Sequence, residues 1–131
     1  PFEPFRMLLV LGVLVLLAFA LTAVGFTLAW SMDSTAGYHG VMMLFLMPML
    51  LLSGAFFPAA GAHPVLAWVM AANPLTYGVA LLRHAYYGAA SPATAGLPAP
   101  IWCAAVTVAF AVGAFWLGTA VVLRRTARDT V

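Results

Sequence analysis

Long apolar runs separated by short polar connections dominate the pattern of this chain. Residues 7–30 form an uninterrupted apolar run, residues 38–57 form a second, and residues 101–123 form a third. An α-helix rises 1.5 Å per residue, so roughly 20 apolar residues cross the hydrocarbon core of a bilayer. Each of the three runs is therefore predicted to be a transmembrane helix.

The stretch at residues 63–88 has a different pattern, because it offers two short helical pieces. The first covers about residues 63–71. The second has the chemistry of a helix start, since Asn73 can cap free amides and Pro74 would occupy the first helical position. Gly88 can end this helix in a left-handed conformation. Neither piece is long enough to cross a bilayer, so we predict a re-entrant helical hairpin that enters and leaves on the same side.

One kinked span over residues 64–83 is the alternative, and the charges at the two ends of the chain do not exclude it. Polar side chains are costly at the centre of a bilayer but are tolerated near the headgroups. Tyr and Trp also prefer that interface. The polar and aromatic residues of the stretch are Trp68, Asn73, Thr76, Tyr77, Arg83, His84, Tyr86 and Tyr87. Their number favours the hairpin, and the expected fold is an all-α integral membrane protein with three transmembrane helices and a re-entrant hairpin before the last.

Composition supports membrane insertion. Of the 131 residues, 66% are hydrophobic and only 6% are charged, which is more apolar surface than a soluble domain of this size can bury. The sequence has no basic stripe of the kind that binds nucleic acid. Arg124, Arg125 and Arg128 directly follow the last run, so the positive-inside rule predicts a cytoplasmic C-terminus. With three crossings, residues 1–6 would then face outward.

The sequence predicts specific roles for one residue in the second run and one in the loop before it. Pro48 lies inside the run, where proline removes a backbone hydrogen bond, so we expect a helix kink there. Asp33 lies in the polar connection at residues 31–37. It is either a solvated turn or capping residue, or a contact with a soluble cytoplasmic partner.

The histidines permit a function of another class. His39, His63 and His84 are the three histidines, and intramembrane histidine can bind haem or copper. His39 would lie at the cytoplasmic face, so only His63 and His84 could share a site across the hairpin. The single cysteine, Cys103, excludes an internal disulfide and a cysteine-based metal site. A membrane redox or metal protein is the alternative to a transport function.

The order of several short motifs resembles a known family. A run ending in LLSGAFFP is followed by a short Pro-started helix with Trp, the element NPLTY, LLR, a Tyr-Gly exit and a final run with an Arg-rich end. This order is similar to that of the C-terminal half of type-2 ABC exporter permeases, the membrane subunits of bacterial efflux systems. The resemblance covers essentially all 131 residues, and its matching positions are residues 53–58, residues 73–77 and Arg83.

The resemblance implies a six-span subunit of which this chain supplies spans four to six. Such permeases form homo- or heterodimers in the bacterial inner membrane and bind ABC ATPase subunits, which carry ATP and Mg. No cofactor and no catalytic residue are then expected in this chain, and the sequence has no GxxxxGK[ST] phosphate-binding loop. Drug, lipid-linked and polysaccharide-type molecules are the implied substrates.

The same resemblance implies that the hairpin forms an outer gate. A structural interpretation stays open for these residues: Asn73, Pro74 and Tyr77 can serve as a helix cap with an interfacial anchor, and the Arg83 side chain can extend to the headgroups. The candidate gate residues are Ser53, Gly54, Phe57, Pro58, Asn73, Pro74, Tyr77 and Arg83.

Overall fold

The computed structural model of the chain describes residues 3–57 and 61–129, and these residues form helices joined by loops. In chain order the elements are α1 (Pro4–Trp30), α2 (Thr35–Leu50), the π-helical turn η1 (Leu51–Ala55), α3 (Pro64–Ala72), α4 (Pro74–Tyr87), the 3-10 turn η2 (Pro92–Thr94) and α5 (Pro100–Asp129). The stretches long and apolar enough to cross a membrane are Pro4–Trp30, Thr35–Ala55 and Pro100–Ala127, and α3 and α4 form a pair bent by 81°. The predicted fold class is confirmed.

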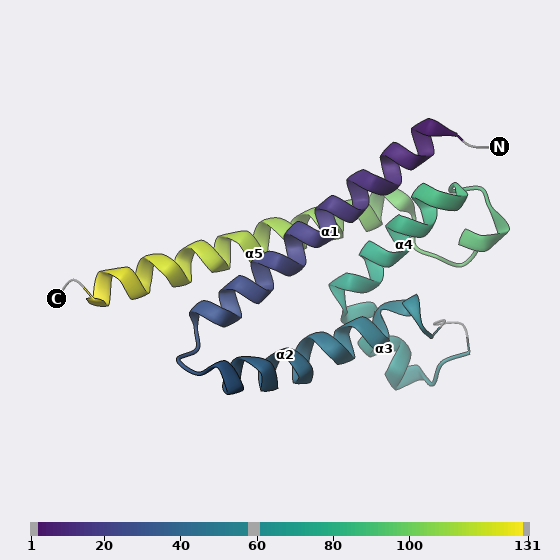
Figure 1. The fold of residues 1–131 in the computed structure, drawn as a ribbon. Coiled ribbons are helices and arrows are strands. Elements are labelled where there is room, and N and C mark those ends of the chain that lie inside the picture. The colour runs from purple at the N-terminus through teal and green to yellow at the C-terminus, as the bar shows by residue number, and fades with distance from the viewer. Residues whose placement is uncertain (1–2, 58–60, 130–131) are drawn as a thin grey trace.

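The two ends of the bundle are clearly distinguished. Figure 1 shows the start of α1 and the C-terminal end of α4 at one end of the bundle. The α1–α2 loop and the end of α5 lie toward the other end. An ion pair of 3.1 Å between Arg125 and Asp33 joins α5 to this loop. Because α5 returns to the end at which α2 began, the segment between α2 and α5 enters and leaves at one end of the bundle.

The inner helix is α4, the second helix of the hairpin. Its buried residues include Leu75, Gly78 and His84, and it packs against α1 and α5. The absence of a side chain at Gly78 lets Leu17 of α1 approach closely. The face that α5 buries carries small residues at helical spacing, which permits close helix packing in a membrane. These residues are Cys103, Thr107, Ala111, Ala114 and Gly118.

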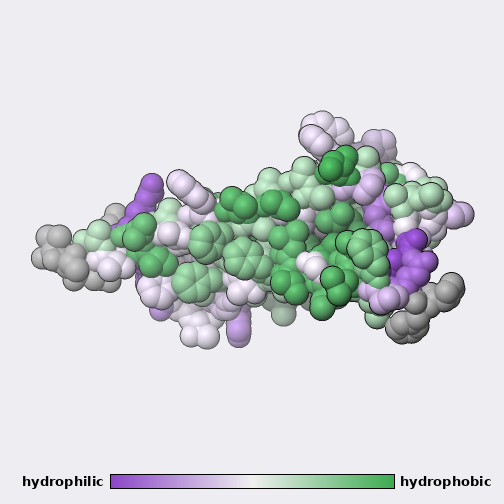
Figure 2. Space-filling view, turned by 90° about the horizontal axis from the view of Figure 1, so that it is seen from above, coloured by the Kyte–Doolittle hydropathy of each residue, from purple (hydrophilic) through white to green (hydrophobic). Residues whose placement is uncertain are grey.

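The second transmembrane helix, α2, has no buried residue. A groove of about 530 Å³ separates it from α1, and another of about 430 Å³ lies beside Pro48 and Phe110 of α5. Figure 2 shows an apolar middle on one face of the molecule, with hydrophilic residues toward both ends. The exposed apolar surface of α2 is therefore available to lipid or to another helix.

The second span differs from its predicted limits of residues 38–57. It begins earlier, at Thr35, because the Ser34 hydroxyl caps the helix by accepting from the Gly37 amide at 3.2 Å, so that Ser34 and not Asp33 is the cap. It ends earlier because Gly54 has a φ of 81°, which a helix cannot continue. Pro48 lies within α2, which continues to Leu50 before the π-helical turn begins. Whether Pro48 acts as the kink stays a prediction.

Candidate functional site at the broken end of α2

The candidate site is the junction at which side chains of the hairpin meet the backbone at the end of α2. The last carbonyls of a helix have no partner within the helix, so other groups must satisfy them. Here side chains from the start and middle of α4 donate to carbonyls of α2 and η1. We call this set the hairpin junction, and its members are the donors Asn73, Thr76 and Arg83 with the carbonyls of Met49, Leu52 and Gly54.

Asn73 uses both halves of its amide. Its Nδ2 donates to the Met49 carbonyl at 2.6 Å, while its Oδ1 accepts from the Leu75 amide at 3.0 Å. Asn73 is therefore the N-cap of α4 and a tertiary contact at once, and Pro74 occupies the first helical position, as the sequence pattern predicts. Only 8% of Asn73 is exposed, so neither bond is open to competition from water.

Thr76 and Arg83 extend the junction along η1. The Thr76 hydroxyl lies 2.7 Å from the Met70 carbonyl and 3.3 Å from the Leu52 carbonyl. Arg83 donates from Nη2 to the Gly54 carbonyl at 2.7 Å. The side chain of Arg83 thus bonds to the broken end of the second span. Its extension to the headgroups stays a prediction.

The backbone turn at the junction depends on Ser53 and Gly54. Ser53 is 1% exposed, and its hydroxyl donates to the Leu50 carbonyl at 2.6 Å and accepts from the Ala55 amide at 3.4 Å. Together with the positive φ of Gly54, these bonds turn the chain out of the helix. Phe57 follows this turn and is 56% exposed, and Pro58 lies outside the described residues.

Tyr77 stabilises the hairpin from within. Its hydroxyl donates to the Ala71 carbonyl in the last turn of α3 at 2.9 Å. Between η1, α3, α4 and the loop at residues 93–98 lies a cavity of about 460 Å³, and both Tyr77 and Arg83 line it. Of the predicted gate residues, the structure thus brings Ser53, Gly54, Tyr77 and Arg83 to one cavity, whereas Asn73 and Pro74 line the groove beside Pro48.

Sequence reasoning missed the roles of Thr76 and Met70. Met70 is 1% exposed and lines the same cavity. Thr76 stands out in the sequence as one polar residue of an apolar segment, which was the only available signal. Which carbonyl its hydroxyl reaches depends on the 81° bend between α3 and α4, and a sequence pattern does not give that angle.

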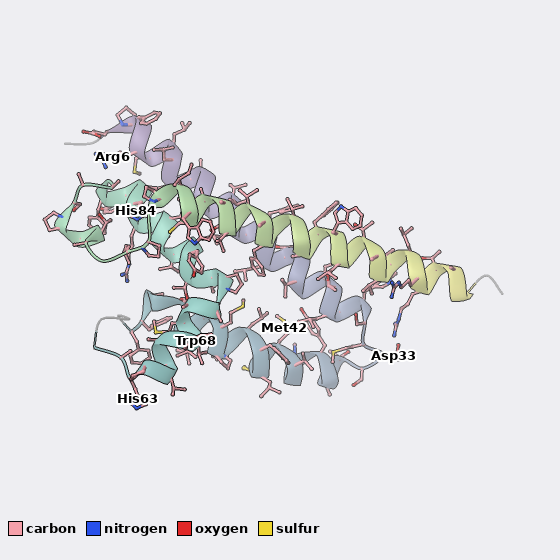
Figure 3. All side chains as sticks on the ribbon, turned by 180° about the vertical axis from the view of Figure 1, so that it is seen from behind. Arg6, Asp33, Met42, His63, Trp68 and His84 are labelled. Carbon is pink, nitrogen blue, oxygen red and sulfur yellow. The ribbon has the colours of Figure 1, made fainter. Side chains whose placement is uncertain are left out.

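The histidines do not form a common site. His63 caps α3, with Nδ1 accepting from the Val65 amide at 3.4 Å, whereas His84 is buried and lies 2.9 Å from the Pro98 carbonyl through Nε2. Figure 3 shows His63 and His84 well apart within the hairpin. Among the described residues, no group of three or more His, Cys, Asp and Glu residues could hold a metal ion. His84 instead attaches the loop before α5 to α4.

Asp33 lies at the other end of the molecule, away from Arg6 and His84 (Figure 3). Its side chain is 89% exposed and pairs with Arg125, which also donates to the Ser31 carbonyl at 3.3 Å. Asp33 therefore ties the α1–α2 loop to α5, and most of its carboxylate surface stays accessible.

These features define a multi-pass membrane protein whose second span is broken and bonded to a re-entrant hairpin. A family model described as ABC-2 type transporter matches residues 1–87, which extend from the start of the chain to the end of α4 and make up more than half of it. The chain therefore belongs to the ABC-2 type transporter family. No curated protein and no solved structure matched the chain.

Family membership confirms the resemblance seen in the motifs. The chain is a permease subunit of an ABC transporter, a transporter component that is not itself catalytic. Membership also implies association with an ABC ATPase subunit.

Proposed function

We propose that this permease belongs to an ATP-driven exporter, with α2 lining the translocation path and the α3–α4 hairpin forming its outer gate. The observation that carries the proposal is the hairpin junction, in which side chains of α4 and its cap bond directly to the end of α2. These part-buried hydrogen bonds couple the two elements, because separating them would leave carbonyls without partners. A shift of α2 would therefore move the gate.

The surface of α2 supports an amphiphilic substrate. Met42 and Met49 line the groove between α1 and α2, and methionine side chains adapt to ligands of different shapes. Met43, Leu44 and Phe45 are exposed on other sides of the same helix, so α2 presents little polar surface in any direction. Within the classes expected from the sequence, this apolar surface favours drugs and lipid-linked molecules over free polysaccharide.

The proposed assembly contains a second permease copy, identical or related, and two cytoplasmic ATPase subunits that hold ATP and Mg. This chain would supply spans four to six of a six-span subunit. The unburied α2 offers apolar surface for the second copy. We place the assembly in the bacterial inner membrane, with the C-terminus in the cytoplasm because Arg124 and Arg125 follow the last span.

In this orientation the α1–α2 loop faces the ATPase subunits. Asp33 lies in that loop with an 89% exposed side chain, so it could contact a basic residue of an ATPase while Arg125 holds the loop in place. We propose Asp33 as a secondary partner contact on this basis.

The decisive experiment is co-purification of the full permease with an ATPase subunit, followed by ATP-driven transport of a fluorescent amphiphile in proteoliposomes. The Asn73→Ser variant keeps an oxygen that can cap α4 but is too short to replace the amide bond to the Met49 carbonyl. We expect it to retain ATP hydrolysis and to lose transport several-fold.

Ser34→Ala is the control, because it removes a cap at the other end of α2 and leaves the junction intact. Equal transport by Asn73→Ser and the native protein would contradict the gate. A purified protein with a metal-dependent absorbance band and no ATP-driven transport would overturn the exporter in favour of a redox or metal-binding function.

A further inference from the structure

We propose that the cavity beside Arg83 binds the negatively charged phosphate headgroup of an anionic membrane lipid. This cavity of about 460 Å³ lies between η1, α3, α4 and the loop at residues 93–98. We call it the hairpin cavity, and the lining residues that matter here are Gly54, Met70, Tyr77, Arg83, Ala95 and Leu97.

The first argument is charge. The chain has only three acidic residues, Glu3, Asp33 and Asp129. Glu3 pairs with Arg6 at 2.6 Å, Asp33 pairs with Arg125 at the opposite end of the bundle, and Asp129 is the last residue of α5, which runs toward that same end. Arg83 therefore has no carboxylate partner in the part of the chain that the structure describes, and its charge is available to an anion.

The second argument is donor geometry. A guanidinium carries five N–H donors, and within residues 3–57 and 61–129 Arg83 makes one hydrogen bond, to the Gly54 carbonyl. Over the described residues, the only buried side-chain nitrogen or oxygen without a hydrogen-bond partner is Nδ1 of His84. The unused nitrogens of Arg83 are therefore accessible, and a phosphate could accept from them. Phosphate and guanidinium form short, charge-assisted hydrogen bonds.

The third argument is the surrounding surface. Met70 and Leu97 supply apolar wall, where charges attract each other more strongly than they do in water. Trp68 and Tyr86 at the same hairpin are 81% and 59% exposed, and such residues prefer the depth of lipid headgroups. A lipid phosphate at that depth is adjacent to the hairpin cavity, and its glycerol and first methylenes match the apolar wall. A lipid therefore fits better than a soluble anion.

Arg83→Gln removes the positive charge, and because its amide nitrogen is two bonds shorter than Nη2 it also gives up the bond to the Gly54 carbonyl. Arg83→Lys, which keeps a positive charge on a shorter side chain than Arg, is therefore measured beside it and should retain more of the phosphatidylglycerol binding. Native mass spectrometry of the purified full permease would count bound short-chain phosphatidylglycerol, with phosphatidylcholine of equal chain length as the comparison lipid. We expect Arg83→Gln to lower phosphatidylglycerol affinity about tenfold, the effect of losing a charge-assisted hydrogen bond. Arg6→Gln is the matched control at the same end and should bind normally, since Arg6 is already paired with Glu3.

A second pair of variants tests the cavity without altering Arg83. Ala95 is exposed and lines the cavity, so Ala95→Asp places a competing carboxylate there and Ala95→Asn adds the same bulk without charge. We expect Ala95→Asp to lose phosphatidylglycerol binding and Ala95→Asn to keep it.

Native affinity in both Arg83→Gln and Ala95→Asp would overturn the site, as would equal binding of the two lipids. Complete displacement by millimolar inorganic phosphate would overturn the lipid assignment in favour of a free-anion site. Because no step needs ATP, the test is independent of the transport proposal.

Discussion

The hydroxyl of Thr76 lies between the last turn of α3 and the π-helical turn η1 that follows α2. Thr76→Val replaces it with a methyl group of similar size and leaves the Leu52 and Met70 carbonyls with one partner fewer. Hydrogen bonds between membrane helices contribute on average about 0.6 kcal/mol and at most about 1.7 kcal/mol. The single O–H proton is shared between the two carbonyls, with the shorter bond to Met70, so we expect a loss of about 1 kcal/mol in the free energy of unfolding, measured by denaturant titration of the purified protein in detergent.

Thr119→Val is the matched control for this change. The Thr119 hydroxyl donates to the Phe115 carbonyl of its own helix at 2.9 Å and is exposed, so its loss should alter the free energy of unfolding by less than about 0.5 kcal/mol. An equal effect of the two substitutions would show that the junction adds nothing to the stability of the fold.

Arg83 and Asn73 show what residue-level reasoning from sequence can reach. The N-cap role of Asn73 was predictable because a cap bonds amides two or three residues away, and the following Pro74 reinforces the signal. The contact of Arg83 with the Gly54 carbonyl was not predictable, because a backbone carbonyl is a group that every residue possesses. Local hydrogen bonds leave a sequence signature, whereas long-range bonds to backbone carbonyls leave none.

The packing of α4 against α1 depends on Gly78. A Cβ atom at that position would collide with Cδ2 of Leu17, which is itself only 9% exposed. Overpacking a core typically costs about 1–3 kcal/mol, and a leucine methyl can partly yield, so we expect Gly78→Ala to lower the free energy of unfolding by about 1 kcal/mol. Thermal or denaturant unfolding in detergent would measure it.

Two comparisons isolate the cause of that loss. Gly113→Ala introduces the same methyl group in α5, where nothing lies within 4 Å, and should be neutral or slightly stabilising because alanine favours helix. In the double variant Gly78→Ala with Leu17→Ala, the collision is removed, so the combined loss should be smaller than the sum of the single losses. Strict additivity would mean that Gly78 and Leu17 do not constrain each other.

At the level of elements, the hairpin could be predicted and its position could not. The Asn-Pro start of α4 and the glycine that follows it are local signals, and they locate both ends of that helix in the sequence. Gly88 does have a positive φ of 88°, but its ψ of 150° is extended and not left-handed helical. Hydropathy alone suggests that the more apolar α2 is the inner helix. In the structure α4 is the inner helix, and α2 has no buried residue. In a membrane, apolar residues face lipid as readily as protein, so hydropathy does not identify the core.

The arrangement of the whole molecule follows from where α5 begins and ends. His84 attaches the loop before α5 to the hairpin, and Arg125 near the end of α5 pairs with Asp33 of the α1–α2 loop. These two contacts place the start and the end of α5 at opposite ends of the bundle, which fits three spanning helices with a bent helix pair, whereas the charges in the sequence left three and four crossings open. A salt bridge between residues this far apart in the chain is visible only in the structure.

Cysteine labelling in intact cells would test this topology. Ala93 in the loop before α5 and Ala36 in the first turn of α2 are both exposed, and they lie at opposite ends of the bundle. With the C-terminus in the cytoplasm, we expect Ala93→Cys to react with an impermeant thiol reagent from outside and Ala36→Cys to react only after permeabilisation. The native Cys103 is fully buried, so the unmodified protein measures background. A fourth crossing by the hairpin would place Ala36 outside as well, and labelling of both variants in intact cells would therefore contradict the re-entrant topology.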